Sequence, residues 1–283
     1  MTQTGATQTG APNPSAPRPI ALVTGVGRPA GIGAAIARAL ATDGWDLALS
    51  YWTPADEAVF GTAASDGLDE VMAELVASGA RVVAIPVDLE RTDAAASVIS
   101  QTRELLGPID ALVLSHAWSV DSALLDTSVE QFDKHFAINT RASWLLIAEF
   151  ARQAQFASQA QFARQAEFAR QAQSGGAIVA LTSDHTAGNL PYGASKGALD
   201  RIVIAAAKEL APRGISANVL NPGPIDTGWM DDATRAALTA LQPGGRLGTP
   251  ADAANLVAFL VSAKGRWVTG QSLKSDGGFS ISI

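Results

Sequence analysis

From residue 20 onward, the chain alternates short apolar runs with longer segments of helical composition. The apolar runs are 20–23, 47–51, 81–87, 109–114, 177–181 and 215–220, and the helical segments are 34–42, 69–78, 92–106, a long one from Ser128, 192–210 and one opening at 246–250. Strands and helices that alternate at this spacing predict a parallel sheet covered by helices on both faces. A chain of 283 residues suits one large or two small domains, and the expected architecture over residues 20–283 is a single α/β domain, a three-layer doubly wound parallel sheet. The segment 228–245 is expected to be a loop.

The composition is typical of a compact enzyme-like chain. Hydrophobic residues make up 47% of the sequence and charged residues 17%, which is too apolar for a disordered chain. A net charge of −7 and a pI near 4.9 argue against nucleic acid or an anionic membrane as the main partner. With no cysteine and three scattered histidines (116, 135 and 185), the sequence offers no metal-ligand spacing, and we expect no metal. No apolar run approaches the roughly 18 residues of a membrane span, and signal-peptide features are absent, so we expect a cytoplasmic protein.

Two segments depart from the globular pattern. Residues 1–19 carry almost no large apolar side chain and are expected to form a disordered tail. From Glu149 a hexapeptide of the type Phe-Ala-Arg-Gln-Ala-Gln recurs, with an apparent insert at about 155–172. A straight helix through that insert would be about 27 Å longer, and three linker residues reach back only roughly 10 Å. We therefore expect the helix to break within the repeat, near Ser158, and the remainder to fold back or to be mobile. The repeat is expected to reflect tandem duplication rather than function.

The first apolar run is followed at once by a glycine-rich turn and a helical segment. The turn contains Gly25, Gly27, Gly31, Ile32 and Gly33. Glycines between a strand and a helix let backbone amides approach a pyrophosphate at the positive helix N-terminus. The turn therefore predicts a dinucleotide site, although a merely tight βα turn would leave the same pattern.

The residues around this turn favour NADP(H) over NAD(H). An NAD site usually has a carboxylate at the end of the second strand, about 20 residues past the glycines, to hold the ribose 2′-hydroxyl. Here that strand ends in Ser50-Tyr51-Trp52, without a carboxylate. Arg28, inside the turn, is placed to meet a 2′-phosphate, unless it is only a solvated loop charge.

A second group of residues predicts proton-transfer chemistry. Tyr192 and Lys196 lie four residues apart, so they share one face of a helix. An ammonium beside a phenol favours the phenolate and lowers a pKa that starts near 10, which suits acid–base work on a substrate oxygen. Taken alone, a tyrosine and a lysine at this spacing could also occur on a helix face by chance. Asn139, on the long helix whose start is marked by a capping-box signal at Ser128, could likewise be a satisfied buried amide.

Taken together, these motifs resemble the classical short-chain dehydrogenase/reductase family, in particular its members similar to 3-oxoacyl-[acyl-carrier-protein] reductase. The matching motifs, in order, are the glycine turn, Asp88, Asn139, Ser183, Tyr192, Lys196, Asn221-Pro-Gly223 and Asp276-Gly-Gly278. The resemblance covers residues 20–283 apart from the repeat and implies a Rossmann fold. Several motifs in the correct order are far more specific than any one of them.

The resemblance also implies roles for individual residues. Tyr192 would be the general acid or base, Ser183 would hydrogen-bond the same substrate oxygen, Lys196 would bind the nicotinamide ribose and tune Tyr192, and Asn139 would hold a water that relays protons to Lys196. The implied cofactor contacts are Gly25, Gly27, Arg28, Gly31, Ile32, Gly33, Ser50, Asp88, Leu89, Ser115, Ala117, Tyr192, Lys196, Pro222, Gly223, Ile225 and Thr227. A homotetramer or homodimer is implied as well, with the long helix and the Tyr192 helix pairing across subunits.

Spacing supports the resemblance, and three departures from the family pattern qualify it. Asn139 and Ser183 are 44 positions apart, and removing three hexapeptides leaves 26, close to the usual separation. The glycine turn is two residues longer than usual, and Ser115-His-Ala-Trp118 stands in place of Asn-Asn-Ala-Gly. The segment from Ser183 to Tyr192 is shorter than usual, so His185 and Trp118 could line the substrate pocket or simply pack.

The leading hypothesis is an NADP(H)-dependent oxidoreductase that reduces a ketone, either a 3-oxoacyl thioester or a small carbonyl compound. A non-catalytic nucleotide-sensing or scaffold protein on the same fold is the alternative from another class. Retention of all four candidate catalytic residues argues against it. Reduction of an enoyl double bond is a third possibility that the Ser–Tyr–Lys arrangement disfavours.

Overall fold

The computed structural model describes residues 17–60, 67–161, 175–228 and 230–281. Seven strands form one sheet, all of them parallel, in the order β3-β2-β1-β4-β5-β6-β7. The strands are β1 (Ile20–Thr24), β2 (Asp46–Tyr51), β3 (Val82–Pro86), β4 (Ala111–Leu114), β5 (Ala177–Leu181), β6 (Ser216–Asn221) and β7 (Ser272–Lys274). The strand order reverses between β1 and β4, and ligands of doubly wound sheets bind beyond the carboxyl ends of the strands at such a point.

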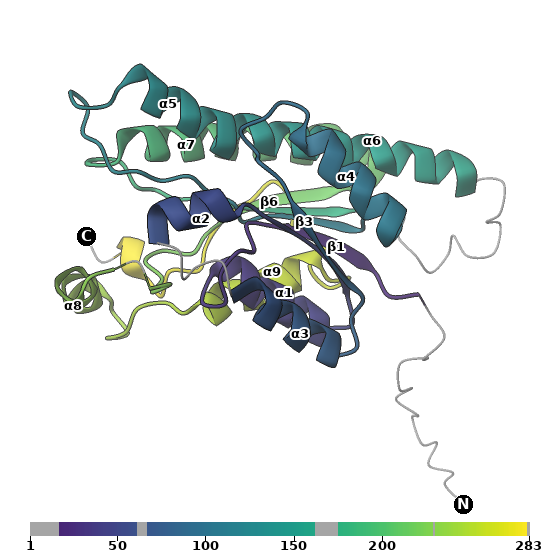
Figure 1. Ribbon diagram of the computed structural model, residues 1–283, viewed down its shortest axis with the longest axis horizontal. Helices are drawn as coiled ribbons and strands as arrows, with labels where there is room; N and C mark the ends of the chain where they lie inside the picture. Colours follow the sequence, from purple (N-terminus) through teal and green to yellow (C-terminus); the bar gives the residue numbers. More distant parts are fainter. Residues whose placement is uncertain (1–16, 61–66, 162–174, 229, 282–283) are drawn as a thin grey trace, which may run out of the picture.

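Helices cover both faces of this sheet, which confirms the predicted three-layer, doubly wound Rossmann architecture (Figure 1). One face carries α1 (Ile32–Thr42), α3 (Gly67–Ala77) and α9 (Pro250–Val261), and the other carries α4 (Ala94–Leu105), α6 (Ser143–Gln161) and α7 (Leu190–Leu210). The remaining helical segments are α2 (Thr53–Phe60), α5 (Val129–His135), the π-helix η2 (Phe136–Ala142), η4 (Ala211–Arg213), α8 (Asp232–Leu241) and η5 (Phe279–Ile281).

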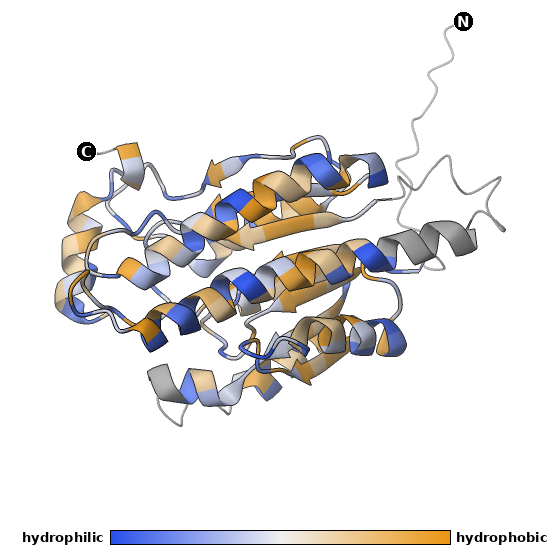
Figure 2. Cartoon of the chain, turned by 90° about the horizontal axis from the view of Figure 1, so that it is seen from above, coloured by the Kyte–Doolittle hydropathy of each residue, from blue (hydrophilic) through white to orange (hydrophobic). Residues whose placement is uncertain are grey.

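The central strands are apolar because both of their faces are covered. All five residues of β1 are buried; Ala21 and Val23 pack with α1 and α9, whereas Leu22 packs with the opposite layer. Alternating side chains of one strand thus supply two separate cores, which explains why the run shows no polar alternation. Figure 2 shows the strands coloured mostly hydrophobic, while the helices mix both classes.

The structure departs from the predicted elements at the surface. The segment expected to be a loop contains α8, whose start is capped by the Asp231 side chain accepting from the Thr234 amide at 2.7 Å. No residue of α8 is buried, although Ala233, Ala237 and Leu241 recur at helical spacing, so the prediction of a loop is wrong here. The 53–60 helix was also not expected; it places the Asp56 carboxylate beside the glycine turn.

The long helix begins at the predicted capping box, which the structure confirms at Ser128 and Gln131. It then passes through the π-helical turn η2 before continuing as α6. The helix runs through Ser158 to Gln161, so the break expected near Ser158 is wrong in position. The rest of the repeat, 162–174, and most of the expected tail, 1–16, lie outside the described residues.

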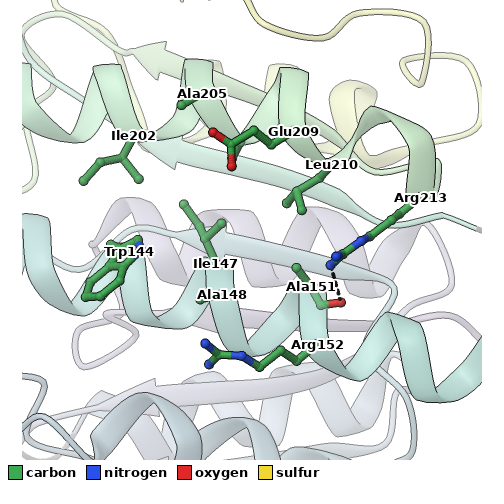
Figure 3. Close-up of a pocket in the computed structure, with 11 residues that line it drawn as sticks. Trp144, Ile147, Ala148, Ala151, Arg152, Ile202, Ala205, Glu209, Leu210 and Arg213 are labelled. Carbon is green, nitrogen blue, oxygen red and sulfur yellow. Dashed lines mark hydrogen bonds between the residues drawn. The ribbon is translucent and has the colours of Figure 1, made fainter.

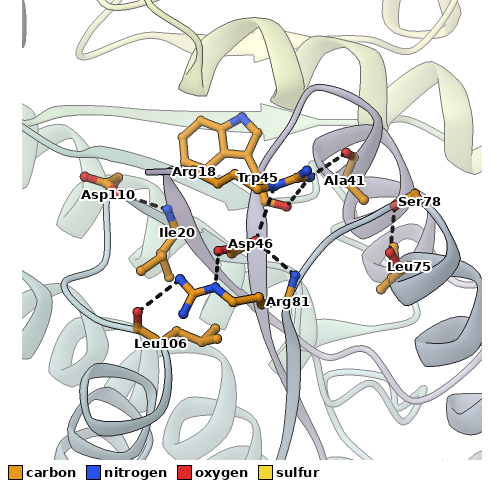
Figure 4. Close-up of polar contacts among 10 residues, drawn as sticks. All are labelled: Arg18, Ile20, Ala41, Trp45, Asp46, Leu75, Ser78, Arg81, Leu106 and Asp110. Atoms are coloured by element: carbon orange, nitrogen blue, oxygen red, sulfur yellow. Dashed lines mark hydrogen bonds and ion pairs between the residues drawn. The ribbon is translucent and has the colours of Figure 1, made fainter. Parts of the chain in front are cut away.

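The amino ends of the first strands are joined by a buried carboxylate (Figure 4). Asp46 Oδ1 accepts the Arg81 backbone amide at 2.9 Å and lies 3.3 Å from Arg18 Nε, while Oδ2 accepts the Arg81 Nε at 2.6 Å. Arg18 also donates to the backbone carbonyls of Ala41 and Trp45. The Asp46 side chain is only 2% exposed, and a carboxylate can be buried this deeply only when it is paired.

Replacing Asp46 with alanine is expected to destabilise the fold by about 2–3 kcal/mol, because the Arg81 amide and Nε lose their acceptor and Arg18 loses its ion-pair partner. Chemical denaturation with the linear extrapolation method measures this free energy of unfolding. The control is Glu74→Ala, which removes an exposed ion pair with Arg38 and should cost below about 1 kcal/mol. Equal losses in both variants would contradict the structural role of Asp46.

Candidate active site

The glycine turn between β1 and α1 has the backbone that a pyrophosphate site requires. Gly25 has a φ of +74°, and a Cβ there would lie 2.7 Å from His116 Cα. A Cβ on Gly33 would lie 2.7 Å from the Gly25 carbonyl oxygen. The N-cap of α1 is Gly31, which has no side chain to accept hydrogen bonds from the first-turn amides. Amides of this kind at a positive helix end suit a phosphate group, so the turn fits a dinucleotide.

Arg28 and Asp56 lie together beside this turn. Arg28 Nη1 donates to the backbone carbonyl of Thr227, in the segment after β6, at 3.0 Å. The carboxylate of Asp56, on α2, lies so close to the turn that a Cβ on Gly27 would collide with it. Burial lowers the pKa of Arg28 and raises the pKa of Asp56, and the attraction between the two charges opposes both shifts. The end of β2 carries no carboxylate, as the sequence indicates, but Asp56, five residues beyond the strand, brings one to the glycine turn.

The other predicted cofactor contacts lie at the same edge of the sheet, because they follow the carboxyl ends of parallel strands. Ser50 ends β2, Asp88 and Leu89 follow β3, Ser115 and Ala117 follow β4, and Pro222, Gly223, Ile225 and Thr227 follow β6. The buried Ser50 hydroxyl has no hydrogen-bond partner among the described residues. Buried polar atoms normally have a partner, so this hydroxyl fits a ligand at the edge.

Tyr192 and Lys196 lie on successive turns of α7, as their spacing predicts. Lys196 Nζ is 5.7 Å from the centre of the Tyr192 ring and donates to the Leu181 carbonyl at the end of β5 at 2.8 Å. The Ser183 hydroxyl accepts the His185 amide at 3.1 Å and forms a side-chain hydrogen bond with Tyr192. One of the two lone pairs of that hydroxyl is therefore used, and its proton can be donated to Tyr192 or to a substrate oxygen beside it.

The electrostatics of this pair differ from expectation. Burial lowers the pKa of Lys196 to about 8, against the opposing effect of Asp200. Burial also raises the pKa of Tyr192 to about 12, and the hydrogen bond from Ser183 offsets only part of that rise. The expectation that Lys196 depresses the Tyr192 pKa is wrong for this arrangement, because the loss of water around the phenol outweighs an ammonium directed at Leu181. Tyr192 is accordingly a neutral phenol near pH 7.

Asn139 connects this pair to the loop after β4. Its Oδ1 accepts the Trp118 amide at 2.7 Å, and its Nδ2 donates to the Trp118 carbonyl and to Ser195 Oγ, both at 2.9 Å. Ser195 in turn donates to the Tyr192 carbonyl at 2.7 Å. Asn139 is fully buried in the π-turn η2, and π-turns inside helices are frequent at functional sites. Its side chain thus fixes the position of α7 relative to the loop.

His116, which replaces an asparagine of the family motif, is a buried neutral connector. Its Nδ1 lies 2.7 Å from Thr24 Oγ1, and its Nε2 lies 3.1 Å from the Ile138 carbonyl. A carbonyl only accepts, so the proton resides on Nε2 and Thr24 donates to Nδ1. Burial, with the Lys196 charge as the second cause, lowers the pKa of His116 to about 3. The imidazole therefore joins the glycine turn to the Asn139 turn without carrying charge.

The two residues proposed as pocket walls have different surroundings. Trp118 is partly buried, and Lys134 Nζ lies 4.0 Å from the centre of its ring, in a cation–π contact. His185 is exposed in a loop that is exposed from 184 to 188. Three functional neighbours were not found from the sequence: Asp56, Ser195 and the connecting role of His116. Ser195 and His116 lie within recognised motifs, Tyr192-Gly-Ala-Ser-Lys196 and Ser115-His-Ala-Trp118, whereas no motif marked Asp56.

Other kinds of site find no support in the described part of the chain. No cluster of three or more His, Cys, Asp or Glu side chains could hold a metal ion there. None of the helices described has both the length and the apolar character needed to cross a membrane.

Comparison with known proteins identifies the family. Residues 25–280 match the family model described as Enoyl-(Acyl carrier protein) reductase. The oxidoreductase YjdA of Bacillus subtilis is 35% identical, covering 92% of this chain and 96% of that protein. An NADPH-dependent aldehyde reductase-like chloroplastic protein of Arabidopsis thaliana is 34% identical, with 92% and 93% covered, and the short-chain dehydrogenase/reductase eriH of Hericium erinaceus is 32% identical, with 92% and 96% covered.

Solved structures give the same result. A blue fluorescent protein from a metagenomic library, in complex with NADPH, has a TM-score of 0.76 and 32% identity, with 93% of this chain and 98% of that chain covered. The angucycline C-6 ketoreductase LanV with bound NADP has a TM-score of 0.74 and 26% identity, with 93% and 96% covered. The chain therefore belongs to the short-chain dehydrogenase/reductase family of oxidoreductases.

Proposed function

We propose that the protein is an NADP(H)-dependent reductase that converts a ketone, a 3-oxoacyl thioester or a small carbonyl compound, to an alcohol. The observation that carries the proposal is the hydrogen bond between Ser183 and Tyr192, with the Lys196 ammonium beside the phenol ring. Two hydroxyl donors that meet at one point suit a single acceptor oxygen, such as that of a carbonyl group. NADPH, when bound, supplies the hydride, and the protein supplies position and electrostatics.

The residues of this chain divide the remaining work. Ser183 and Tyr192 donate hydrogen bonds to the substrate oxygen, and Tyr192 gives up its proton as negative charge develops there. The high pKa of Tyr192 keeps that proton in place until the reaction needs it, and Lys196 stabilises the phenolate that remains. Asn139 is the proposed holder of the relay water. Because its side-chain amide is engaged, its backbone carbonyl, which already accepts from Ser143, is the group with a second lone pair to offer.

The glycine turn and Arg28 support NADP(H) as the cofactor. The backbone amides at Gly31 to Gly33 would hold the pyrophosphate, Ser50 and Asp88 would meet the adenosine half, and Ile225 and Thr227 the nicotinamide. Arg28 would pair with a 2′-phosphate, for which a guanidinium is well suited. The Arabidopsis relative is named as NADPH-dependent, and two similar structures hold NADPH or NADP.

Other activities fit the site less well. A scaffold protein would not need a buried lysine beside a tyrosine, because burying a cation costs free energy. Enoyl reduction, the activity in the name of the matching family model, requires a proton at carbon, whereas Ser183 and Tyr192 both address one oxygen.

A panel of ketones and 3-oxoacyl thioesters assayed with NADPH and NADH tests the proposal. We expect at least one ketone to be reduced, with a higher kcat/KM for NADPH. Reduction of enoyl thioesters alone, or tight NADPH binding without turnover of any carbonyl compound, would contradict it.

We also propose that the chain forms a homodimer or homotetramer through α6 and α7. A groove of 460 Å³ runs between these helices on the outer face, lined by apolar side chains such as Ile147 and Ile202 (Figure 3). Trp144, at one end, is 52% exposed. The groove also carries Glu209 and Arg152, so a two-fold copy of the same face could place opposite charges together.

Replacing Trp144 with glutamate is expected to convert the oligomer to a smaller species, because a carboxylate would be buried at the helix pair without a partner. Light scattering coupled to size-exclusion chromatography measures the mass. The control is Val76→Glu on α3, where the side chain is 56% exposed on the opposite layer. An unchanged mass in the Trp144 variant would remove this interface.

A further inference from the structure

Lys196 is a buried cation, and no carboxylate contacts its ammonium group among the hydrogen bonds and ion pairs of the described residues. The residue is 2% exposed, and the acceptor of its ammonium is the Leu181 carbonyl, which carries no charge. A buried ammonium is costly unless a carboxylate offsets it. The mechanism proposed above uses Lys196 only as an ammonium, so the group that stabilises its positive charge inside the protein matters for function.

Asp200 is placed to supply it. It follows Lys196 by four residues on α7, so the two side chains leave the same face of the helix. The Asp200 side chain hydrogen-bonds the hydroxyl of Thr182, the residue next to Leu181, which Lys196 contacts. Both side chains therefore reach the same end of β5. The Oδ1 atom of Asp200 is buried and has no hydrogen-bond partner among the described residues, so Thr182 satisfies only part of the carboxylate.

The other charged or titratable groups around Lys196 do not compensate its charge. His116, from the loop after β4, is neutral, and its contact with the Lys196 charge disfavours protonation. Tyr192, on α7, is a neutral phenol near pH 7. Arg201, next to Asp200, is itself a cation and acts on Asp200. Asp200 is the anion in this group, and its attraction to Lys196 opposes the effect of burial.

We propose that Asp200 is a positioning residue for Lys196, whose carboxylate keeps the ammonium charged and directed at the end of β5. The proposal deepens the proposed function, on which it rests, because it explains why Lys196 remains a cation inside the protein. Asp200 does not touch the substrate oxygen; it acts through Lys196 and sets the upper pH at which the site works.

The sign of the expected effect follows from the charge. A neutral side chain at position 200 removes the attraction that favours the Lys196 ammonium, so Lys196 should lose its proton at lower pH. Turnover that needs the ammonium should then decline at lower pH as well, while activity well below the titration of Lys196 should change little.

The direct test follows the titration of Lys196 by NMR. The chain has five lysines, so selective ¹³C labelling of the lysine side chains gives few signals, and Lys196→Arg identifies the relevant one. We expect the wild-type signal to titrate near pH 8 and that of Asp200→Asn to titrate about one pH unit lower. Asp200→Glu should restore much of the shift, whereas Thr182→Val, which keeps the charge and removes one hydrogen bond, should move it less than Asp200→Asn.

An identical Lys196 titration in wild type and Asp200→Asn would overturn the proposal. Thermal unfolding verifies that each variant folds, and Asp200→Ser is the second neutral variant if the asparagine disrupts α7. The NMR measurement needs no turnover, so a failure to reduce any ketone would count against the proposed function and not against the role of Asp200. Where turnover is present, the alkaline limb of the pH–kcat profile should move with the NMR midpoint, and a limb that stays in place would limit Asp200 to a structural role.

Discussion

Replacing Tyr192 with phenylalanine is expected to lower kcat for ketone reduction by about 1,000-fold while cofactor binding is retained. The change deletes one hydroxyl and leaves the ring against Lys196, so the loss reports on proton donation and not on packing. General acid catalysis by a positioned side chain contributes roughly 10²–10⁴-fold. Ser183 could still hydrogen-bond the substrate oxygen but, with no ammonium beside it to stabilise its anion, would be a poor proton donor.

The measurement is NADPH oxidation with a ketone accepted by the wild type, together with NADPH fluorescence to determine its Kd. Tyr51, at the end of β2 and separated from β5 by β1 and β4, provides the matched change, and Tyr51→Phe should keep kcat within about threefold. Turnover by Tyr192→Phe at the wild-type rate would sink the catalytic proposal. A parallel loss of NADPH affinity would instead point to a binding role for the hydroxyl.

The fold could be predicted because it depends on features that the sequence shows directly. Buried parallel strands appear as uninterrupted apolar runs, and the capping box at Ser128 marks a helix start through local hydrogen bonds. Two elements escaped prediction for different reasons. The helix α8 has a local start signal, the Asp231 cap, which the prediction of a loop overlooked. The π-turn around Asn139 changes backbone hydrogen bonding without requiring a distinctive residue.

Prediction of the site succeeded for local relationships and failed for those that depend on tertiary contacts. The spacing of Tyr192 and Lys196 follows from helix geometry, and their common face was predictable. The direction of the Tyr192 pKa was not, because it depends on how much water the folded chain excludes from the phenol. Asp56 was missed for a similar reason: the turn from β2 into α2 returns it to the glycine turn, and strand-end spacing does not show this.

Replacing Arg28 with alanine is expected to weaken NADPH binding by about 10–100-fold and NADH binding by less than about threefold. A charge-assisted hydrogen bond contributes roughly 1.5–3 kcal/mol, which corresponds to that range of affinity, and only NADPH carries the 2′-phosphate. Arg28 now pairs with Asp56 and the Thr227 carbonyl, so binding of a phosphate would compete with those partners. The discrimination should therefore be smaller than for an arginine without a neighbouring carboxylate.

Replacing Asp56, the partner of Arg28, should shift the cofactor preference in the opposite direction. Its carboxylate would repel a 2′-phosphate and would accept a hydrogen bond from a 2′-hydroxyl, so Asp56→Asn should tighten NADPH and weaken NADH. The ratio of the NADPH Kd to the NADH Kd, measured by fluorescence for each variant, should thus rise for Arg28→Ala and fall for Asp56→Asn. Arg103→Ala, an exposed arginine on α4, controls for a general loss of positive charge and should leave the ratio of the two Kd values unchanged. Equal weakening of NADPH and NADH by Arg28→Ala would show that Arg28 contacts the pyrophosphate or shapes the turn, and the preference for NADP(H) would then need another source, such as the Ser50 hydroxyl.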